Sequence, residues 1–294
     1  MIKADMKKAI SIISLLLSIP WVSAQMDDQL EEIKNTYESG ELENAMTAFN
    51  SYIASNDQNY LAYKLRGDCR QKLLQYEDAI LDYDSALSIS KEDPRIYVSR
   101  GAARMSLGKL KQAIRDFDKV IEMDPDDADA YFNRGGALYL SFDNRGALKD
   151  LNRALALNPD HADALFIRGV VKGELYDEKD GIEDIERALS LKTELDGAQM
   201  SLAVLLYEIE EWQNAIEAFS KVIDAKDKYL TDALYYRGDC KYNLGNKETA
   251  CVDWNESADL GDDDAIYIVA NYCNTDSKKI PKKRKKKRNT TITF

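Results

Sequence analysis

The sequence has very little of the residue on which most catalytic and metal sites depend. Only one histidine, His161, occurs among the 294 residues. This excludes a zinc site of three histidines and leaves a Ser-His-Asp triad with one candidate base. The GxSxG, HExxH and glycine-rich phosphate-binding motifs are also missing. The sequence therefore predicts a protein that is not an enzyme and needs no cofactor or metal.

Cysteine and long apolar runs are scarce as well. Four cysteines are too few for a scaffold built on disulfides, and no CxxC pair suggests a metal site. The apolar stretch 9–19 is short against the roughly 20 residues that cross a bilayer. The formal net charge of −12 argues against specific nucleic-acid binding, because phosphate contacts need clustered Lys and Arg. We expect a chain that does not span a membrane.

The first residues have the pattern of a secretory signal peptide. Lys3, Lys7 and Lys8 precede the apolar stretch 9–19, and the small-residue site Val22-Ser23-Ala24 follows it. We expect residues 1–24 to be removed and the product to be exported, to a periplasm or to the medium.

The last residues form a basic tail. Residues 275–294 hold nine basic residues and one acidic residue, whereas residues 25–274 hold 50 acidic and 28 basic residues. A run of like charge repels itself, so the tail is expected to be disordered. Its densest part is Lys282, Lys283, Arg284, Lys285, Lys286, Lys287 and Arg288.

A period of 34 residues organises the chain between these ends. Arg-Gly steps recur at Arg66, Arg100, Arg134 and Arg168, and once more at Arg237. A small residue follows each glycine by twelve positions, and a bulky apolar residue comes four positions later. Each period contains two stretches with helical spacing of apolar residues, separated by a turn. Such a hairpin cannot bury its apolar face alone, so stacking on its neighbours completes the core. We expect the glycine of the first helix to face the small residue of the second.

These positions resemble the tetratricopeptide repeat family, with its Gly or Ala at repeat position 8, Ala at 20, an aromatic at 24 and Pro at 32. The resemblance implies an all-α, right-handed α-solenoid of about seven helix-turn-helix repeats over residues 25–274. The expected repeats are 26–59, 60–93, 94–127, 128–161, 162–195, 196–230 and 231–264, with a capping helix at 265–274.

A charge pattern runs through the repeats. The five repeats with Arg at position 7 are also the five with Asp at position 23. The other two repeats, 26–59 and 196–230, lack both residues, and we call them the deviant repeats. Positions 7 and 23 lie close together in an antiparallel hairpin, so we expect structural pairs within a repeat or with the next one. The pairs are Arg66 and Asp82, Arg100 and Asp116, Arg134 and Asp150, Arg168 and Asp184, and Arg237 and Asp253.

Export permits a disulfide. Because solenoid repeats contact only their neighbours, Cys69 cannot reach the other three cysteines. A bridge between Cys251 and Cys273 is slightly favoured, and one between Cys240 and Cys251 stays open.

The family resemblance also implies a partner-binding groove. The first helices of successive repeats line it, and positions 5 and 12 face the partner. The expected groove residues are Val98, Met105, Phe132, Tyr139, Phe166, Met200, Tyr207, Tyr235 and Tyr242. Such apolar rows usually bind an extended or helical peptide.

The leading hypothesis is thus an exported scaffold that binds a protein or peptide in this groove. The alternative is an envelope-associated adaptor, held to an anionic polymer or a membrane surface by its basic tail.

Overall fold

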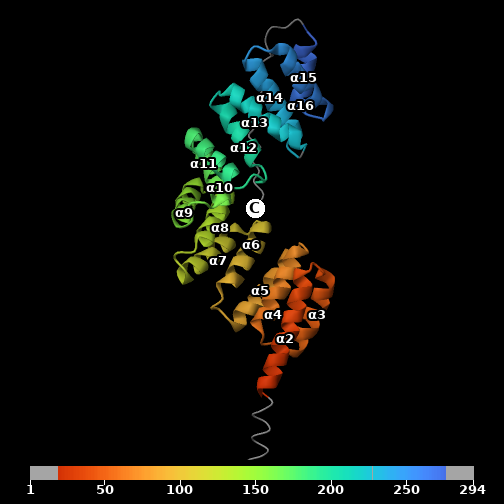
Figure 1. The fold of residues 1–294 in the computed structure, drawn as a ribbon, viewed down its shortest axis with the longest axis vertical. Coiled ribbons are helices and arrows are strands. Elements are labelled where there is room, and N and C mark those ends of the chain that lie inside the picture. Colours follow the sequence, from red (N-terminus) through yellow and green to blue (C-terminus); the bar gives the residue numbers. More distant parts are fainter. Residues whose placement is uncertain (1–18, 227, 276–294) are drawn as a thin grey trace, which may run out of the picture. The chain divides into compact units, whose positions relative to one another are not determined.

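A computed structural model describes the backbone of residues 19–226 and 228–275, with side chains from residue 28 onward (Figure 1). The chain divides into two compact bodies, Met1–Pro125 and Asp126–Phe294. All regular structure in the described ranges is helical. The helices of the N-terminal body are α2 (Ile19–Glu38), α3 (Leu42–Ser55), α4 (Tyr60–Lys72), α5 (Tyr76–Ile89), α6 (Pro94–Ser106) and α7 (Leu110–Met123).

The C-terminal body continues the same alternation. Its helices are α8 (Ala128–Leu140), α9 (Asn144–Leu157), α10 (Ala162–Glu174), α11 (Glu178–Leu191), α12 (Ala198–Glu208), α13 (Trp212–Ala225), α14 (Leu230–Asn243), α15 (Lys247–Asp259) and α16 (Asp263–Ile268). A π-helical turn, η1 (Val269–Cys273), closes the series where the sequence predicts a capping helix.

Consecutive helices pair as the repeat pattern predicts. Each repeat supplies a first and a second helix joined by a short turn, and within each body the second helix also packs on the first helix of the next repeat. Successive hairpins therefore follow one another in chain order within a body (Figure 1). The predicted all-α solenoid of helix-turn-helix repeats is confirmed. Residues 1–18 and 276–294 lie outside the described residues, and the expected cleavage site after Ala24 lies within α2.

Capping side chains set several helix starts. Asp93 precedes α6, and its carboxylate accepts a hydrogen bond from the Arg95 backbone N–H, while Pro94 occupies the first turn. Asp127 accepts from the Ala130 N–H at the start of α8 in the same way. A side-chain acceptor satisfies an N–H that has no partner within the helix, which fixes where the helix begins.

The glycine at position 8 of the first helix lies close to the second helix of its own hairpin. A Cβ on Gly101 would lie 2.7 Å from Phe117 Cε1, and one on Gly67 would lie 2.6 Å from Tyr83 Cε1. A Cβ on Gly169 would lie 2.6 Å from the Gly181 carbonyl oxygen and equally close to Ile185 Cγ1, so the expected contact with the small residue at position 20 is confirmed in the repeat 162–195. In the repeats 60–93 and 94–127 the glycine at position 8 faces the ring at position 24 instead. The ring occupies the volume that a side chain on the first helix would fill.

Every turn between the two helices of a repeat passes through the left-handed region of φ. Three of these turns use glycine, at Gly40, Gly108 and Gly245. The other four place a residue with a side chain at the same position. These residues are Leu74, Phe142, Tyr176 and Glu210, with φ between 61° and 65°.

Candidate functional site

The five arginine–aspartate pairs are the most regular polar feature of the described chain. In the repeat 94–127, Arg100 Nε–H donates to Asp116 Oδ2 at 3.1 Å and its Nη2–H donates to Oδ1 at 2.6 Å. The other four arginines bind the aspartate sixteen residues later in the same bidentate way. All five aspartates are buried. The structure therefore brings each predicted pair together within one hairpin.

Most of these aspartates hold a second cation that the sequence pattern did not reveal. Arg104 Nη1 lies 2.6 Å from Asp116 Oδ2, and Lys241 Nζ lies 2.7 Å from Asp253 Oδ2. Arg70 and Lys172 occupy the same place in their repeats. The sequence feature that could have revealed these second cations is a basic residue four positions after the repeating arginine. These contacts neutralise the buried carboxylates, so the role of the pairs is to stabilise the folded hairpins.

The arginines also connect one repeat to the next. Arg100 Nη1–H donates to Asp84 at 2.6 Å, and Arg168 Nη1–H donates to Asn152 at 3.0 Å. Arg66 reaches Asn50 and Arg237 reaches Ser220 in the same manner. Each acceptor belongs to the second helix of the preceding repeat. These contacts join neighbouring repeats into a ladder, which the repeat 196–230 interrupts because Leu202 stands in place of the arginine.

Three of the nine predicted groove residues belong to the hydrophobic core. Phe166, Met200 and Tyr235 are 4%, 7% and 1% exposed. Their placement on a partner surface is corrected, because these three side chains pack within the core of the C-terminal body. Val98 and Met105 remain half-buried on α6 of the N-terminal body.

The other four predicted groove residues are half-buried aromatics of the C-terminal body, namely Phe132, Tyr139, Tyr207 and Tyr242. They lie on α8, α12 and α14, and α8, α10, α12 and α14 contact one another in sequence. We call the surface of these four helices the first-helix face. It comprises these aromatics and the carboxylates of Asp129, Asp163, Glu174, Glu208, Asp232 and Asp239.

Other rings fix the orientation of these aromatics. Tyr207 packs edge-on against Trp212 and Tyr236, with ring centroids 5.4 and 5.3 Å away. Its hydroxyl donates to Asp239 at 3.3 Å, and burial raises the pKa of Tyr207 above its usual value. Phe132 lies 4.7 Å from the His161 ring. Rings held in this way offer contact area with little further loss of conformational entropy.

The charge of the first-helix face has one sign. The basic residues of its helices are Arg134, Arg168, Lys172, Arg237 and Lys241, and each contacts a buried aspartate of a second helix. The six acidic residues carry the remaining charge of these helices. Two of them contact side chains from adjoining turns: Asp129 lies 3.2 Å from His161 Nε2, and Asp163 pairs with Lys192.

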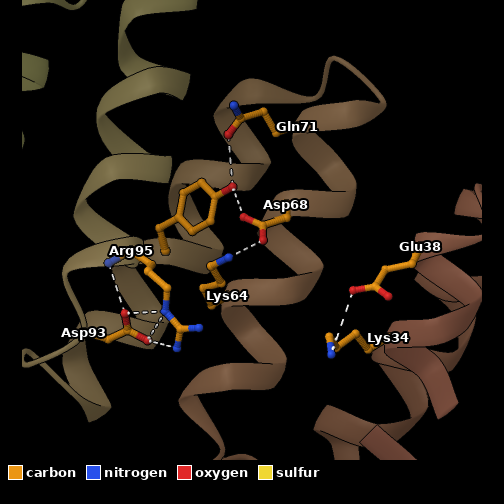
Figure 2. Close-up of polar contacts among 8 residues, drawn as sticks. Lys34, Glu38, Lys64, Asp68, Gln71, Asp93 and Arg95 are labelled. Atoms are coloured by element: carbon orange, nitrogen blue, oxygen red, sulfur yellow. Dashed lines mark hydrogen bonds and ion pairs between the residues drawn. The ribbon is translucent and has the colours of Figure 1, made fainter. Parts of the chain in front are cut away.

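The N-terminal body arranges its charges differently. Lys64 Nζ lies 2.5 Å from Asp68 Oδ2, and Arg95 pairs with Asp93 at the start of α6 (Figure 2). The Asp68 carboxylate also accepts from the Tyr83 hydroxyl at 2.9 Å. Positive and negative groups thus pair with one another on α4 and at the start of α6, whereas α2 has five acidic residues and Lys34 as its one basic residue.

The most exposed large apolar side chains lie at turns and were missed by the sequence reasoning. Phe142 is 93% exposed, Tyr176 is 86% exposed and Leu74 is 70% exposed. All three occupy the left-handed turn position. The sequence feature that could have revealed these exposed side chains is an apolar residue at the turn position where other repeats have glycine.

The cysteines divide into one bridge and two buried thiols. Cys251 and Cys273 form a disulfide that ties α15 to η1, with Cα atoms 5.7 Å apart. Cys69 and Cys240 are free and buried, and burial raises the pKa of the Cys240 thiol to about 12. A thiol with so high a pKa is protonated and unreactive at neutral pH.

The deviant repeat 196–230 carries a cavity of about 400 Å³ between the loop before α12 and the end of α13. Gln199 and Lys221 line it, and Lys228 pairs with Asp196 near its mouth. No three His, Cys, Asp or Glu side chains among the described residues converge as a metal site would require. None of the helices within residues 19–275 has the length and apolarity to cross a bilayer.

Comparisons with known proteins agree with the architecture. Family models described as TPR repeat and tetratricopeptide repeat match residues 101–141, 128–161 and 232–257. No curated protein sequence matches the chain significantly.

Several solved structures share the fold at low sequence identity. A tetratricopeptide repeat protein from Parabacteroides merdae is 17% identical with a TM-score of 0.62, over 82% of this chain and 95% of that one. Part of a TPR repeat-containing protein from Cytophaga hutchinsonii is also 17% identical, with a TM-score of 0.63 over 81% of this chain and 98% of its own. YrrB, described as a TPR protein with an unusual peptide-binding site, is 23% identical over 64% of this chain and 97% of its own, with a TM-score of 0.56. The chain thus contains tetratricopeptide repeats within residues 101–161 and 232–257, and its described residues share the fold of tetratricopeptide-repeat proteins.

Proposed function

We propose that the protein is an exported scaffold that binds a segment of another protein on the first-helix face of its C-terminal body. One observation carries the proposal: four half-buried aromatic rings and six carboxylates lie on helices that contact one another in sequence. Proteins of this repeat family typically act as non-catalytic scaffolds for peptides or proteins, and YrrB is described as having a peptide-binding site. The proposal extends that role to this chain.

The chemistry of the face favours a particular kind of segment. Tyr207 and Tyr242 provide flat, partly exposed rings, which are the side chains that most often dominate binding energy. Carboxylates such as Glu174 and Glu208 flank them. A segment with apolar side chains and Lys or Arg residues is complementary to both features.

Photo-crosslinking tests this function directly. A benzoylphenylalanine side chain in place of Tyr139 or Tyr242 should form adducts with a discrete set of proteins in growing cells, which mass spectrometry identifies. The control places the same group at Val252, which is exposed on the second helix α15. Equal adducts from positions 139, 242 and 252, or none from the two face positions, would contradict the proposal.

Export is proposed on two grounds. The sequence of residues 1–24 has a basic start, an apolar centre and a small-residue cleavage site. The Cys251–Cys273 disulfide is of a kind that persists mainly in oxidising compartments. Amino-terminal sequencing of the protein from a cell envelope fraction should start at Gln25. A start at Met1 in the cytosolic fraction would refute this.

The basic tail supports a second candidate function, that of an adaptor held to an anionic polymer or membrane surface. The observation that favours it is the run of seven basic residues at 282–288. Binding to phosphatidylglycerol vesicles should then fall steeply between low and physiological salt, and it should vanish when residues 278–294 are deleted.

A further inference from the structure

We propose that the basic segment 278–288 docks onto the first-helix face of its own chain and so competes with the partner segment. The inference rests on the proposed function, because it assigns an occupant to the same face. It makes the tail a regulator of access to the face.

Charge complementarity is the first ground. The first-helix face carries six carboxylates, and the cations of its four helices are engaged by buried aspartates. Segment 278–288 carries nine basic residues and no acidic one. Two surfaces of opposite sign within one molecule attract each other, and the chain connection raises their effective concentration to the millimolar range.

The place where the described chain ends is the second ground. Tyr272 packs edge-on against Tyr242 of the face, with ring centroids 5.5 Å apart. The disulfide at Cys273 holds this end of the chain to α15, and Lys247 Nζ–H donates to the Thr275 carbonyl at 3.0 Å. Thr275, three residues before the basic segment in the sequence, is therefore held to α15, and Tyr272 contacts α14, the last helix of the face.

The length of the tail matches the face. At about 3.3 Å per extended residue, the segment from Lys278 to Arg288 reaches positions roughly 10 to 43 Å from Thr275. Packed neighbouring helices lie about 8–10 Å apart, so the three steps from α14 to α8 span roughly 30 Å. The segment can therefore pass Asp239 and Glu208 and still reach Asp163 on α10.

The aromatic rings provide the second type of contact. Tyr242 and Tyr139 are half-buried on helices that also carry Asp239 and Asp129. A lysine or arginine above such a ring gains a cation–π contact in addition to its ion pair. On α4 of the N-terminal body, in contrast, Lys64 pairs with Asp68.

A zero-length carbodiimide crosslinker, which joins a lysine amine to a carboxylate within contact distance, tests the docking on the full chain. In the monomer, amide bonds should form between the tail lysines and the carboxylates at 163, 174, 208 and 232. The variant Asp163→Asn, Glu174→Gln, Glu208→Gln and Asp232→Asn removes four of these acceptors, so its readout is tail crosslinking to Asp129 and Asp239, which it keeps. That crosslinking should fall about tenfold, because four charge contacts are lost.

A matched variant controls for the change in net charge. Glu183→Gln, Glu217→Gln, Asp224→Asn and Asp259→Asn remove four exposed carboxylates from second helices of the same body. Tail crosslinking in this variant should stay near the parent value. Circular dichroism melting of both variants shows that each is folded. Equal losses in the two variants would overturn the proposal.

An isotope mixture separates docking within a chain from docking between chains. When labelled and unlabelled chains are mixed before crosslinking, docking in cis gives no peptide pair of mixed label. Mixed pairs, or a tail that becomes protected from trypsin only when phosphatidylglycerol vesicles are added, would overturn the proposal. The assay needs no partner protein, so its failure is distinct from a failure of the photo-crosslinking test of partner binding.

Discussion

At the scale of single residues, the hairpins depend on volumes and backbone conformations that only certain side chains allow. Gly101 leaves room for the Phe117 ring, and Tyr83 takes the same space opposite Gly67. Phe142, in contrast, holds a left-handed turn conformation that costs a residue with a Cβ about 1 kcal/mol. The first type of residue optimises packing, whereas the second gives up stability at an exposed position.

Gly101→Ala is expected to lower the free energy of unfolding by about 1–3 kcal/mol, because the new Cβ must displace a ring in a filled core. Urea denaturation measures the change. Ser106→Ala is the control, since Ser106 is exposed on the same helix and its replacement should shift stability by no more than about 0.5 kcal/mol. Equal effects of the two substitutions would show that the glycine contact is unimportant.

Phe142→Gly is expected to stabilise the protein by about 0.5–1 kcal/mol. Glycine accepts a positive φ without strain, although it adds entropy to the unfolded chain, which offsets part of the gain. Thermal melting followed by circular dichroism measures the effect. Phe142→Ala keeps the Cβ and removes the ring, so a similar gain in that variant would assign the effect to the exposed ring instead.

At the scale of helices and hairpins, four of the seven repeats are held by a buried carboxylate between two cations. Asp116 on α7 receives Arg100 and Arg104 from α6, and Arg100 extends to Asp84 in the previous repeat. The aspartate is buried, so its charge depends on these partners. One side chain thus fixes both the register of the hairpin and its contact with the next one.

Asp116→Ala is expected to lower the free energy of unfolding by about 3–5 kcal/mol, because two half-buried guanidinium groups lose their main acceptor. Chemical denaturation provides the value. Glu122→Ala on the same helix removes an exposed pair with Lys119 and should cost about 0–1 kcal/mol. A loss of under about 1 kcal/mol at position 116 would mean that the pair is solvated and contributes little.

The helical hairpins and their charge pairs could be predicted from the sequence because both repeat with a fixed period. The charge pairs follow from positions 7 and 23, whose spacing the antiparallel hairpin makes short. The face could be predicted only in part. Phe166 and Tyr235 share a repeat position with Phe132, yet only Phe132 is left half-buried, since coverage depends on how closely neighbouring first helices pack. That depends on three-dimensional packing, which a single repeat does not encode.

At the scale of the whole molecule, stability comes from the contacts that each hairpin makes with the hairpins next to it in the sequence. In the C-terminal body one continuous core runs from Ala147 to Tyr272, and the disulfide closes its end. A solenoid transmits a perturbation only through adjoining hairpins, so damage at one end should remain local.

Reduction of the Cys251–Cys273 bridge is expected to remove about 3 kcal/mol of stability from the last hairpin and its cap. Hydrogen exchange read by mass spectrometry should show faster exchange in α15 and α16, with little change in α8 and α9. Cys251→Ser with Cys273→Ser should give the same pattern without a reductant. Uniformly faster exchange throughout the C-terminal body would mean that it unfolds as one cooperative unit.

The arginine ladder also bears on how such a chain can change its length. A repeat with the pair carries its own acceptor, and the second helix before it supplies a polar group such as Asn152 or Ser220 for the remaining arginine nitrogen. Duplicating one of these repeats would therefore reproduce both halves of the joint without any new sequence. The repeat 196–230 has Leu202 and Ala218 in place of the pair, so a copy of it would stack without this link. Growth or loss of repeats by recombination is thus least disruptive among the hairpins that carry the ladder.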